Sequence, residues 1–173
     1  LKKILEKKNT CKSIWFMRQA GRYLPEFREI RKENPDFIKL CLNSELSSKI
    51  TLHPIKRFNL DSAIIFSDIL IVPYSLGQNV KFIKESGPKL SNFNIECFLD
   101  VTENQFSKTL SPVYKSIEIT RRKLDKKKSL ISFIGAPWTL LIYMLNIKKE
   151  NNKEVDITKL KKEKITINKI LKK

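Results

Sequence analysis

The sequence is poor in glycine, cysteine and histidine, and it has no long hydrophobic run. Its 173 residues include 4 Gly, 3 Cys and 1 His. Cys11, Cys41 and Cys97 form no Cys-x-x-Cys pair and have no metal-ligand spacing with His53, so we expect no metal site. An odd number of cysteines without a visible secretion signal predicts reduced thiols and a cytoplasmic protein. No apolar run approaches the roughly 18 residues of a membrane span, so we expect no membrane association.

Acidic residues are also scarce relative to basic ones. The chain has 35 Lys+Arg and 18 Asp+Glu, a formal net charge of +17. A basic surface suggests nucleic-acid binding, because it releases counterions from phosphates. The excess, however, is mostly lysine (28 Lys against 7 Arg) and lies mainly in residues 121–173, where no aromatic residues interleave with the basic clusters as base stacking requires. Lys, Ile and Asn are also the residues that A- and T-rich codons encode. We therefore favour solvated lysines, with a nucleic-acid-binding module as the less favoured alternative.

Short apolar runs predict the strands of the fold. Residues 63–66 form a continuous apolar stretch, typical of a strand buried on both faces, and the mostly apolar residues 130–134 are a second candidate of this kind. Residues 14–17 form a third run, which ends at a Gly-containing loop. Buried strands that alternate with helices predict a parallel α/β fold, in which the chemistry lies at the carboxyl ends of the strands.

Helical spacing and capping residues predict the remaining elements. Residues 1–8 are typical of a helix end, and Pro25 begins a short helix to residue 32. Asn43 or Ser44 is expected to cap a helix reaching Phe58. Further helices are predicted from Ser111-Pro112 to residue 124, over 139–145, and as one helix from Asp156. Residues 73–94 are rich in turn-forming residues and predict a long surface excursion.

Polar side chains follow the predicted strands. Arg18 and Arg22 lie on one loop around Gly21, and two guanidinium groups there suit carboxylates or phosphates, although a pair of surface arginines is equally compatible. Asp68 stands in an otherwise apolar stretch, where a carboxylate needs donors from the protein or a ligand. A structural Asp that caps a helix is the alternative. Tyr143 follows the third loop, either as a core residue or as a ligand contact.

Three blocks of sequence resemble the uroporphyrinogen decarboxylase family. The first is WFMRQAGRYLPEFR at residues 15–28, and the second is FSDIL at residues 66–70, followed by Pro73 and Gly77. The third is GAPWTL at residues 135–140, followed by Tyr143-Met144. The blocks occur in the family's order, which makes the resemblance specific.

The resemblance implies a (β/α)8 barrel of the TIM type, of which residues 1–173 would be the N-terminal half of a single domain. It implies a homodimer in the cytosol that converts uroporphyrinogen III to coproporphyrinogen III by removing four acetate carboxylates, without cofactor or metal. The chain begins at Leu1 rather than Met. The resemblance places a hydroxyl residue and a histidine that complete the site beyond Lys173, and we expect the 173 residues alone to be inactive.

The resemblance also assigns roles to individual residues. Asp68 would accept hydrogen bonds from the pyrrole N–H groups and stabilise a cationic intermediate. The residues expected to hold the substrate's carboxylates or to contact it elsewhere are Arg18, Gln19, Ala20, Gly21, Arg22, Arg31 and Tyr143. One arginine, for which Arg18 is the candidate, would assist proton delivery. A related barrel methyltransferase of corrinoid or thiol metabolism, which would hold zinc with His and Cys, is the alternative within the fold.

Overall fold

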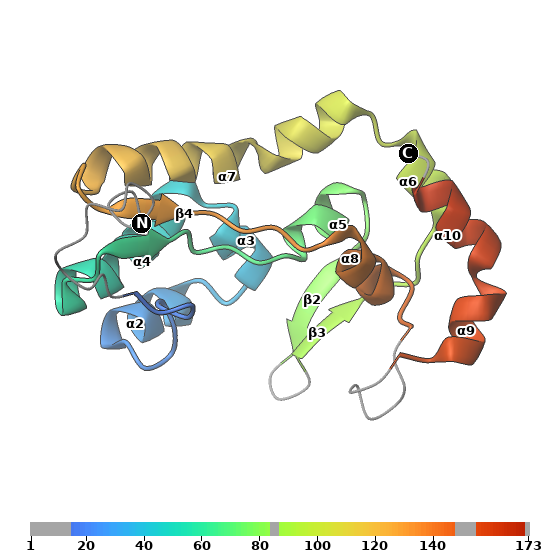
Figure 1. Ribbon diagram of the computed structural model, residues 1–173, viewed down its shortest axis with the longest axis horizontal. Coiled ribbons are helices and arrows are strands. Elements are labelled where there is room, and N and C mark those ends of the chain that lie inside the picture. Colours follow the sequence, from blue (N-terminus) through green and yellow to red (C-terminus); the bar gives the residue numbers. More distant parts are fainter. Residues whose placement is uncertain (1–14, 84–86, 148–154, 172–173) are drawn as a thin grey trace, which may run out of the picture. The chain divides into compact units, whose positions relative to one another are not determined.

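A computed structural model describes residues 15–83, 87–147 and 155–171. The chain divides into two compact units. Unit 1 comprises Leu1–Asp68 and Ser111–Phe133, and unit 2 comprises Ile69–Leu110 and Ile134–Lys173. Both units contain helices and strands (Figure 1), which agrees with the predicted α/β class. The strands of the described residues form two separate two-stranded sheets, so this part of the chain contains no complete barrel.

Unit 1 combines several helices with a short parallel sheet. Its elements are α2 (Pro25–Glu33), α3 (Phe37–Cys41), α4 (Ser44–Phe58), β1 (Ser62–Ile64), the C-terminal part of α7 (Glu103–Lys123) and β4 (Ser129–Ile131). Asn43 caps α4, because its side-chain oxygen accepts a hydrogen bond from the N–H of Leu46 (3.0 Å). The helix ends at Asn59, which adopts the left-handed conformation (φ 48°) that asparagine tolerates. The predicted bounds and N-terminal cap of this helix are confirmed.

The strands β1 and β4 pair in parallel, with Ala63 opposite Leu130. The N–H of Ile65 donates to the carbonyl of Ile131 (3.0 Å), and the N–H of Ser129 donates to the carbonyl of Asp61 (3.0 Å). Both strands lie in or beside the apolar runs that predict them. Each is shorter than its run, and β4 is only half-buried along its length.

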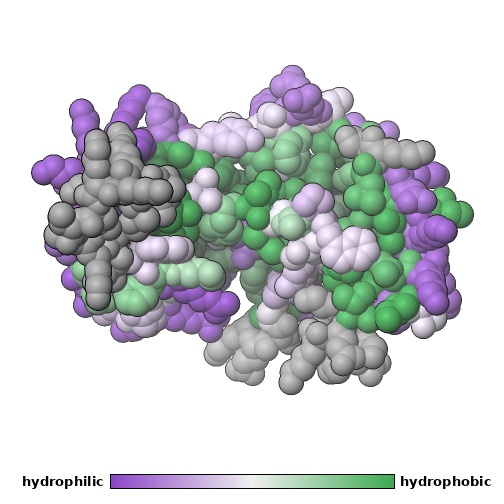
Figure 2. All heavy atoms as spheres, viewed as in Figure 1, coloured by the Kyte–Doolittle hydropathy of each residue, from purple (hydrophilic) through white to green (hydrophobic). Residues whose placement is uncertain are grey.

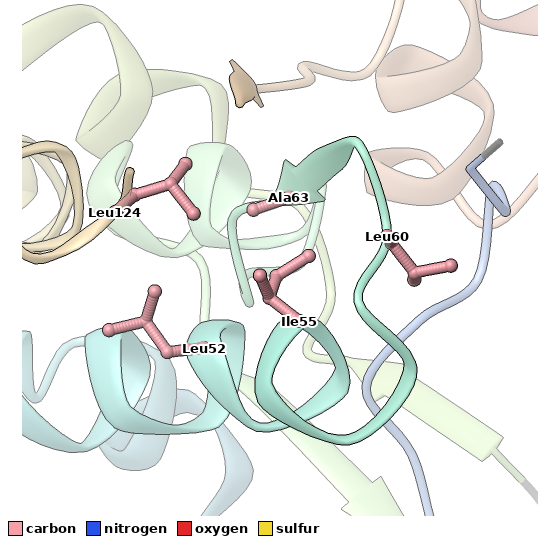
Figure 3. Close-up of a cluster of buried hydrophobic side chains, with 5 residues drawn as sticks. All are labelled: Leu52, Ile55, Leu60, Ala63 and Leu124. Atoms are coloured by element: carbon pink, nitrogen blue, oxygen red, sulfur yellow. The ribbon is translucent and has the colours of Figure 1, made fainter. Parts of the chain in front are cut away.

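A hydrophobic cluster joins this sheet to the helices of unit 1. Leu52 and Ile55 point from α4 toward Ala63 of β1 and Leu124 (Figure 3). Leu60, in the connection from α4 to β1, completes the cluster, and Leu130 of β4 packs against it. Because Ala63 is fully buried and small, α4 packs closely on the strand. This packing fixes β1, and with it the start of the segment that leads to Asp68.

Unit 2 contains a β-hairpin and several short helices. Its elements are α5 (Ile71–Ser75), β2 (Val80–Ile83), β3 (Gly87–Leu90), α6 (Ile95–Asp100), the N-terminal part of α7, α8 (Pro137–Met144), α9 (Ile157–Lys162) and α10 (Lys164–Leu171). The strands β2 and β3 are antiparallel. Buried Gln78 ties the hairpin to α8, because its Nε2 donates to the carbonyls of Ser91 (2.8 Å) and Met144 (2.9 Å). The hydrophobic core of this unit comprises Leu141, Ile142, Leu145, Ile147 and Ile167, with Phe93, Leu160 and Ile170 packed against it.

The prediction that Ser111 and Pro112 begin a helix is wrong. The helix α7 begins eight residues earlier, at Glu103, and continues through Pro112 to Lys123. Its start is marked by a capping box: the side chain of Gln105 accepts from the N–H of Thr102 (2.8 Å), and the Thr102 hydroxyl accepts from the N–H of Gln105 (3.2 Å). The sequence Thr-x-x-Gln therefore carried the signal for the true start.

Other predictions need correction. The run at residues 14–17 forms no strand over its described part, because Trp15, Phe16 and Met17 are exposed and lack strand pairing. The segment 73–94 contains most of α5 and the β2–β3 hairpin rather than only turns. Asp156 does cap a helix, accepting from the N–H of Lys159 (3.0 Å), but two helices follow it instead of one.

The helices predicted at 25–32 and 139–145 correspond to α2 and α8. The helix end predicted at residues 1–8 lies outside the described residues.

Large apolar side chains are unusually exposed for a globular chain. Figure 2 shows hydrophobic surface among the hydrophilic residues on the face it presents. The most exposed examples, each more than half accessible, are Phe16, Met17, Tyr23, Tyr114, Ile134, Ile157, Ile165 and Leu171. No helix in the described part of the chain is both long enough and apolar enough to cross a membrane.

Candidate functional site

The loop that carries Arg18 and Arg22 makes a turn before α2. The N–H of Leu24 donates to the carbonyl of Gly21 (3.0 Å), and Arg28 of α2 donates from Nη1 to the carbonyl of Arg22 (2.9 Å). Both Arg18 and Arg22 are exposed, whereas Leu24 at the end of the loop is buried. The loop thus presents two accessible guanidinium groups on a turn that its own backbone and α2 hold in place.

The side chain of Gln19 anchors this loop to β1. Gln19 is only 4% exposed. Its Nε2 donates to the carbonyl of Ser62 (2.7 Å), and its Oε1 accepts from the N–H of Ile64 (3.1 Å). The hydroxyl of Tyr23 donates to the backbone carbonyl of Gln19. The sequence resemblance predicts Gln19 as a substrate contact, whereas its side chain is directed into the protein.

The segment after β1 is held by side chains of α4. Ser47 donates from Oγ to the carbonyl of Phe66 (2.7 Å), and the hydroxyl of Thr51 accepts from the N–H of Phe66 (2.8 Å). Both hydroxyls are buried, so they satisfy a peptide that would otherwise lack partners after the strand ends. Asp68 follows two residues later and is half-buried. The expected position of Asp68, just beyond the carboxyl end of a strand, is confirmed.

Arg31 is held by an aromatic cluster in the same unit. Its guanidinium carbon lies 5.3 Å from the centre of the Phe37 ring, and its Nη1 donates to the carbonyl of Asn34. The Phe37 ring meets the Phe66 ring edge-on at 5.7 Å, and Phe66 also meets Phe27 at 5.6 Å. Arg31 is therefore connected through two rings to the segment that carries Asp68.

The thiol of Cys41 is buried, and charged residues of the candidate site affect its pKa. Burial raises the pKa of Cys41 most strongly, and the nearby carboxylates of Asp68 and Asp36 raise it further. The Arg31 guanidinium acts on the same thiol in the opposite direction. The charges of Asp68 and Arg31 therefore act on the pKa of the same buried thiol in opposite directions.

Other predicted residues have different surroundings. Tyr143 lies on α8 in unit 2 and is half-buried. Ala20 and Gly21 are half-buried within the arginine loop. His53 lies on α4, and its Nδ1 is buried without a hydrogen-bond partner among the described residues. Within residues 15–83, 87–147 and 155–171, no three His, Cys, Asp or Glu side chains are grouped so as to hold a metal ion.

Sequence reasoning missed the residues that support this site. Phe37 and Phe66 position Arg31, and Thr51 holds the peptide of Phe66. The sequence gives only a partial signal for Phe37. Asp36 caps α3 by accepting from the N–H of Lys39 (3.1 Å), which marks Phe37 as the first residue of a helix. No local pattern identifies Thr51 as a partner of a residue 15 positions later, because that contact depends on the packing of α4 against β1.

Comparison with known proteins decides the family. The family model described as "Uroporphyrinogen decarboxylase (URO-D)" matches residues 1–173. The chain belongs to the uroporphyrinogen decarboxylase family. The three sequence blocks that predict this membership include the arginine loop and the segment of Asp68.

Curated relatives carry the same name. The uroporphyrinogen decarboxylase of Orientia tsutsugamushi (strain Ikeda) is 49% identical over 139 residues, which are 80% of this chain and 40% of the relative. Those of Neorickettsia sennetsu and Chelativorans sp. are 49% and 46% identical over 77% and 76% of this chain. The chain spans about 40% of the length of these decarboxylases.

A solved structure shares the fold at low sequence identity. A methyltransferase from Methanosarcina mazei aligns with a TM-score of 0.56 and 15% identity, covering 83% of this chain and 41% of that chain. At this identity the likeness concerns the fold alone.

Proposed function

We propose that the protein containing these 173 residues removes the four acetate carboxylates of uroporphyrinogen III and yields coproporphyrinogen III. The observation that carries the proposal is the arginine loop anchored on β1, the strand that leads to Asp68. The substrate is a ring of carboxylates around pyrrole N–H groups, so it needs cations at its rim and an acceptor at its centre. Membership of the decarboxylase family supports this assignment.

The chemistry of the substrate explains why a central carboxylate is needed. A proton adds to the pyrrole α-carbon next to the carbon that bears the acetate, and the ring becomes a cationic iminium conjugated with the acetate-bearing carbon. The bond to the carboxylate then breaks, carbon dioxide leaves, and the electron pair moves into the ring. Protonation of the new methylene carbon and loss of the added ring proton restore the pyrrole, now with a methyl group. Asp68 would accept the pyrrole N–H bonds and stabilise the cationic ring, with no metal or cofactor required.

The remaining residues would bind and orient the substrate. Arg18 and Arg22 are exposed, and each offers a planar pair of donors to an acetate or propionate group. Arg18 is the candidate for assisting proton delivery, and the backbone of Ala20 and Gly21 would line the same side. Arg31 is held over Phe37, whose ring packs against Phe66, and would bind a further carboxylate. Tyr143, which belongs to the third sequence block, would also contact the substrate.

The architecture of the full-length protein belongs to the same proposal. The strands β1 and β4 are parallel neighbours joined through helices, as in a (β/α)8 barrel. We propose that the full-length protein completes such a barrel, acts as a homodimer and works in the cytoplasm. Exposed apolar side chains such as Phe16, Met17 and Ile134 would then be covered by the rest of the barrel or by the second subunit.

Turnover of uroporphyrinogen III by the full-length protein tests the function. The porphyrinogens are oxidised after reaction and separated by chromatography, so the loss of each carboxylate is counted. We expect coproporphyrinogen with EDTA present, and at least a hundredfold loss of turnover in Asp68→Asn, because removing one preorganised electrostatic group costs about that much. Asp100→Asn, which alters an exposed carboxylate at the end of α6, is the matched control. Absence of decarboxylated product from the wild-type protein would refute the proposed function.

The 173-residue chain by itself provides a second arm of the experiment. We expect it to be inactive and poorly soluble, because it leaves apolar side chains and strand edges exposed. Size-exclusion chromatography and the same product assay measure both properties. Formation of coproporphyrinogen by this chain would show that the residues beyond it are dispensable.

A further inference from the structure

We infer that Gln19 is a positioning residue, which takes the place of a neighbouring strand along β1 and so holds Arg18 and Arg22 for binding substrate carboxylates. The inference rests on the proposed function for its substrate. Gln19 would act through the arginines rather than by touching the substrate, a role different from the one its place in the motif suggests.

The hydrogen bonds of β1 show that Gln19 occupies the edge opposite β4. In a parallel pair, successive residues direct their backbone groups alternately to the two edges of the strand. Asp61 and Ile65 bond to β4. Ser62 and Ile64 therefore face the other edge, where they bond to Gln19.

The two bonds reproduce those of a strand residue opposite Ala63. In parallel pairing, one residue donates its N–H to the carbonyl before its partner and accepts from the N–H after it. The carboxamide of Gln19 donates to the carbonyl of Ser62 (2.7 Å) and accepts from the N–H of Ile64 (3.1 Å), which are the groups before and after Ala63. A side-chain amide is chemically equivalent to a peptide group, so the strand edge is satisfied without a second backbone.

Few other side chains fit this position. Glutamate has the same length, but its ionised carboxylate has no N–H to donate to the carbonyl of Ser62. Methionine fills a similar volume and makes neither bond. Either change leaves a buried backbone group of β1 without its partner and releases the loop from the strand.

The anchor acts directly on the arginine loop. Gln19 lies between Arg18 and the turn at Gly21, and its backbone carbonyl accepts a hydrogen bond from the hydroxyl of Tyr23. Gln19 is 4% exposed, while both arginines are exposed. The buried carboxamide thus fixes the backbone from which the two cations project, and its loss would leave them attached to a loop with more conformations.

A double-mutant cycle in the full-length protein tests this inference. The Michaelis constant for uroporphyrinogen III is measured in wild type, Gln19→Met, Arg18→Gln/Arg22→Gln and the triple variant. We expect Gln19→Met to raise KM about tenfold, because it weakens binding of the substrate carboxylates, and to lower kcat by a smaller factor, through the part of Arg18 in proton delivery. In the arginine-free background the same change should alter KM less than about twofold, because the residues through which it acts are gone.

Thr120→Val is the matched control for a loss of stability. Thr120 is fully buried in α7 of unit 1 and donates to the carbonyl of Ser116 (2.6 Å), so its replacement also removes a buried hydrogen bond. We expect an unchanged KM. An unchanged KM in Gln19→Met, or a tenfold effect that persists without the arginines, would overturn the inference.

Hydrogen–deuterium exchange separates this inference from the proposed function, because it needs no turnover. Peptides that cover residues 15–24 should exchange faster in Gln19→Met than in wild type, whereas Thr120→Val should leave them unchanged. If the wild-type protein decarboxylates nothing but this exchange pattern is found, the function fails and the anchor stands. Equal exchange in wild type and Gln19→Met would refute the anchor, whatever the activity.

Discussion

The guanidinium group of Arg31 lies over the ring of Phe37, with 5.3 Å between the guanidinium carbon and the ring centre. The ring in turn packs edge-on against Phe66, two residues before Asp68. A cation held over an aromatic face loses freedom before any substrate arrives. The cluster therefore places Arg31 beside the segment of Asp68 in advance.

Replacement of Phe37 is expected to weaken substrate binding through Arg31. A cation–π contact of this kind contributes about 1 kcal/mol, so Phe37→Leu should raise KM for uroporphyrinogen III roughly fivefold in the full-length protein. Phe37→Tyr keeps the ring and should retain the wild-type KM. Phe93→Leu, which removes an aromatic pair in unit 2, controls for loss of packing alone. A wild-type KM in Phe37→Leu would contradict this role of the ring.

Removal of the Thr51 hydroxyl should destabilise the protein. Thr51→Val preserves the shape but leaves the N–H of Phe66 without its partner, and a buried unsatisfied group costs about 1–3 kcal/mol. Urea unfolding of the full-length protein measures the change. Thr109→Val removes an exposed helical hydrogen bond to Gln105 (3.0 Å) and should cost much less, because water can replace it. Equal losses in the two variants would show that the Phe66 contact has no special importance.

Local patterns predicted the parts of the fold that depend on local chemistry. Asn43 as the cap of α4 and the apolar run that includes Ala63 and Ile64 of β1 could be read from short stretches of sequence. The start of α7 was missed because Ser111-Pro112 is a typical beginning, while the capping box at Thr102 lies farther upstream. Within α7, the carbonyl of Pro112 accepts a hydrogen bond from the hydroxyl of Ser44 (2.9 Å), a tertiary contact that local patterns do not encode.

In the candidate site, too, local features were predictable from the sequence and long-range contacts were not. The motif around Arg18 and Arg22 and the place of Asp68 at the end of a strand were predictable, because charge in an apolar context is visible in sequence. The side-chain direction of Gln19 was not, because it depends on a strand edge more than 40 residues away. The link from Arg31 to Phe66 likewise arises only when α2, α3 and β1 pack together.

The chain's histidine is expected to make stability depend on pH. Burial is the main cause that lowers the pKa of His53, and Lys49, Lys56 and Arg57 lower it further, while Glu26 opposes them. The unfolded chain, with an ordinary pKa near 6.5, therefore binds a proton that the folded protein resists. The contribution of neutral His53 is complete above about pH 6.5 and is lost as the pH falls toward the folded pKa.

Urea unfolding of wild type and His53→Gln between pH 7.5 and 5.5 measures this effect. We expect the free energy of unfolding to fall toward pH 5.5 in wild type, with a shallower slope in the variant. Glu26 is not the cause in this range, because its hydrogen bond with Arg57 keeps its pKa below the ordinary value near 4.5. Identical slopes in the two proteins would contradict a lowered pKa of His53.

Two described cysteines should differ sharply in reactivity. Cys97 is exposed on α6, whereas Cys41 is 1% exposed and burial raises its thiol pKa. Because the thiolate is the reacting form, iodoacetamide at pH 8 should alkylate Cys97 in the folded full-length protein and Cys41 only after unfolding in urea. Mass spectrometry of the two peptides measures each rate. Asp68 also raises the pKa of Cys41, but burial is the larger cause, so Cys41 should stay protected in Asp68→Asn. Rapid labelling of Cys41 in that folded variant would show instead that the Asp68 charge, and not burial, protects the thiol.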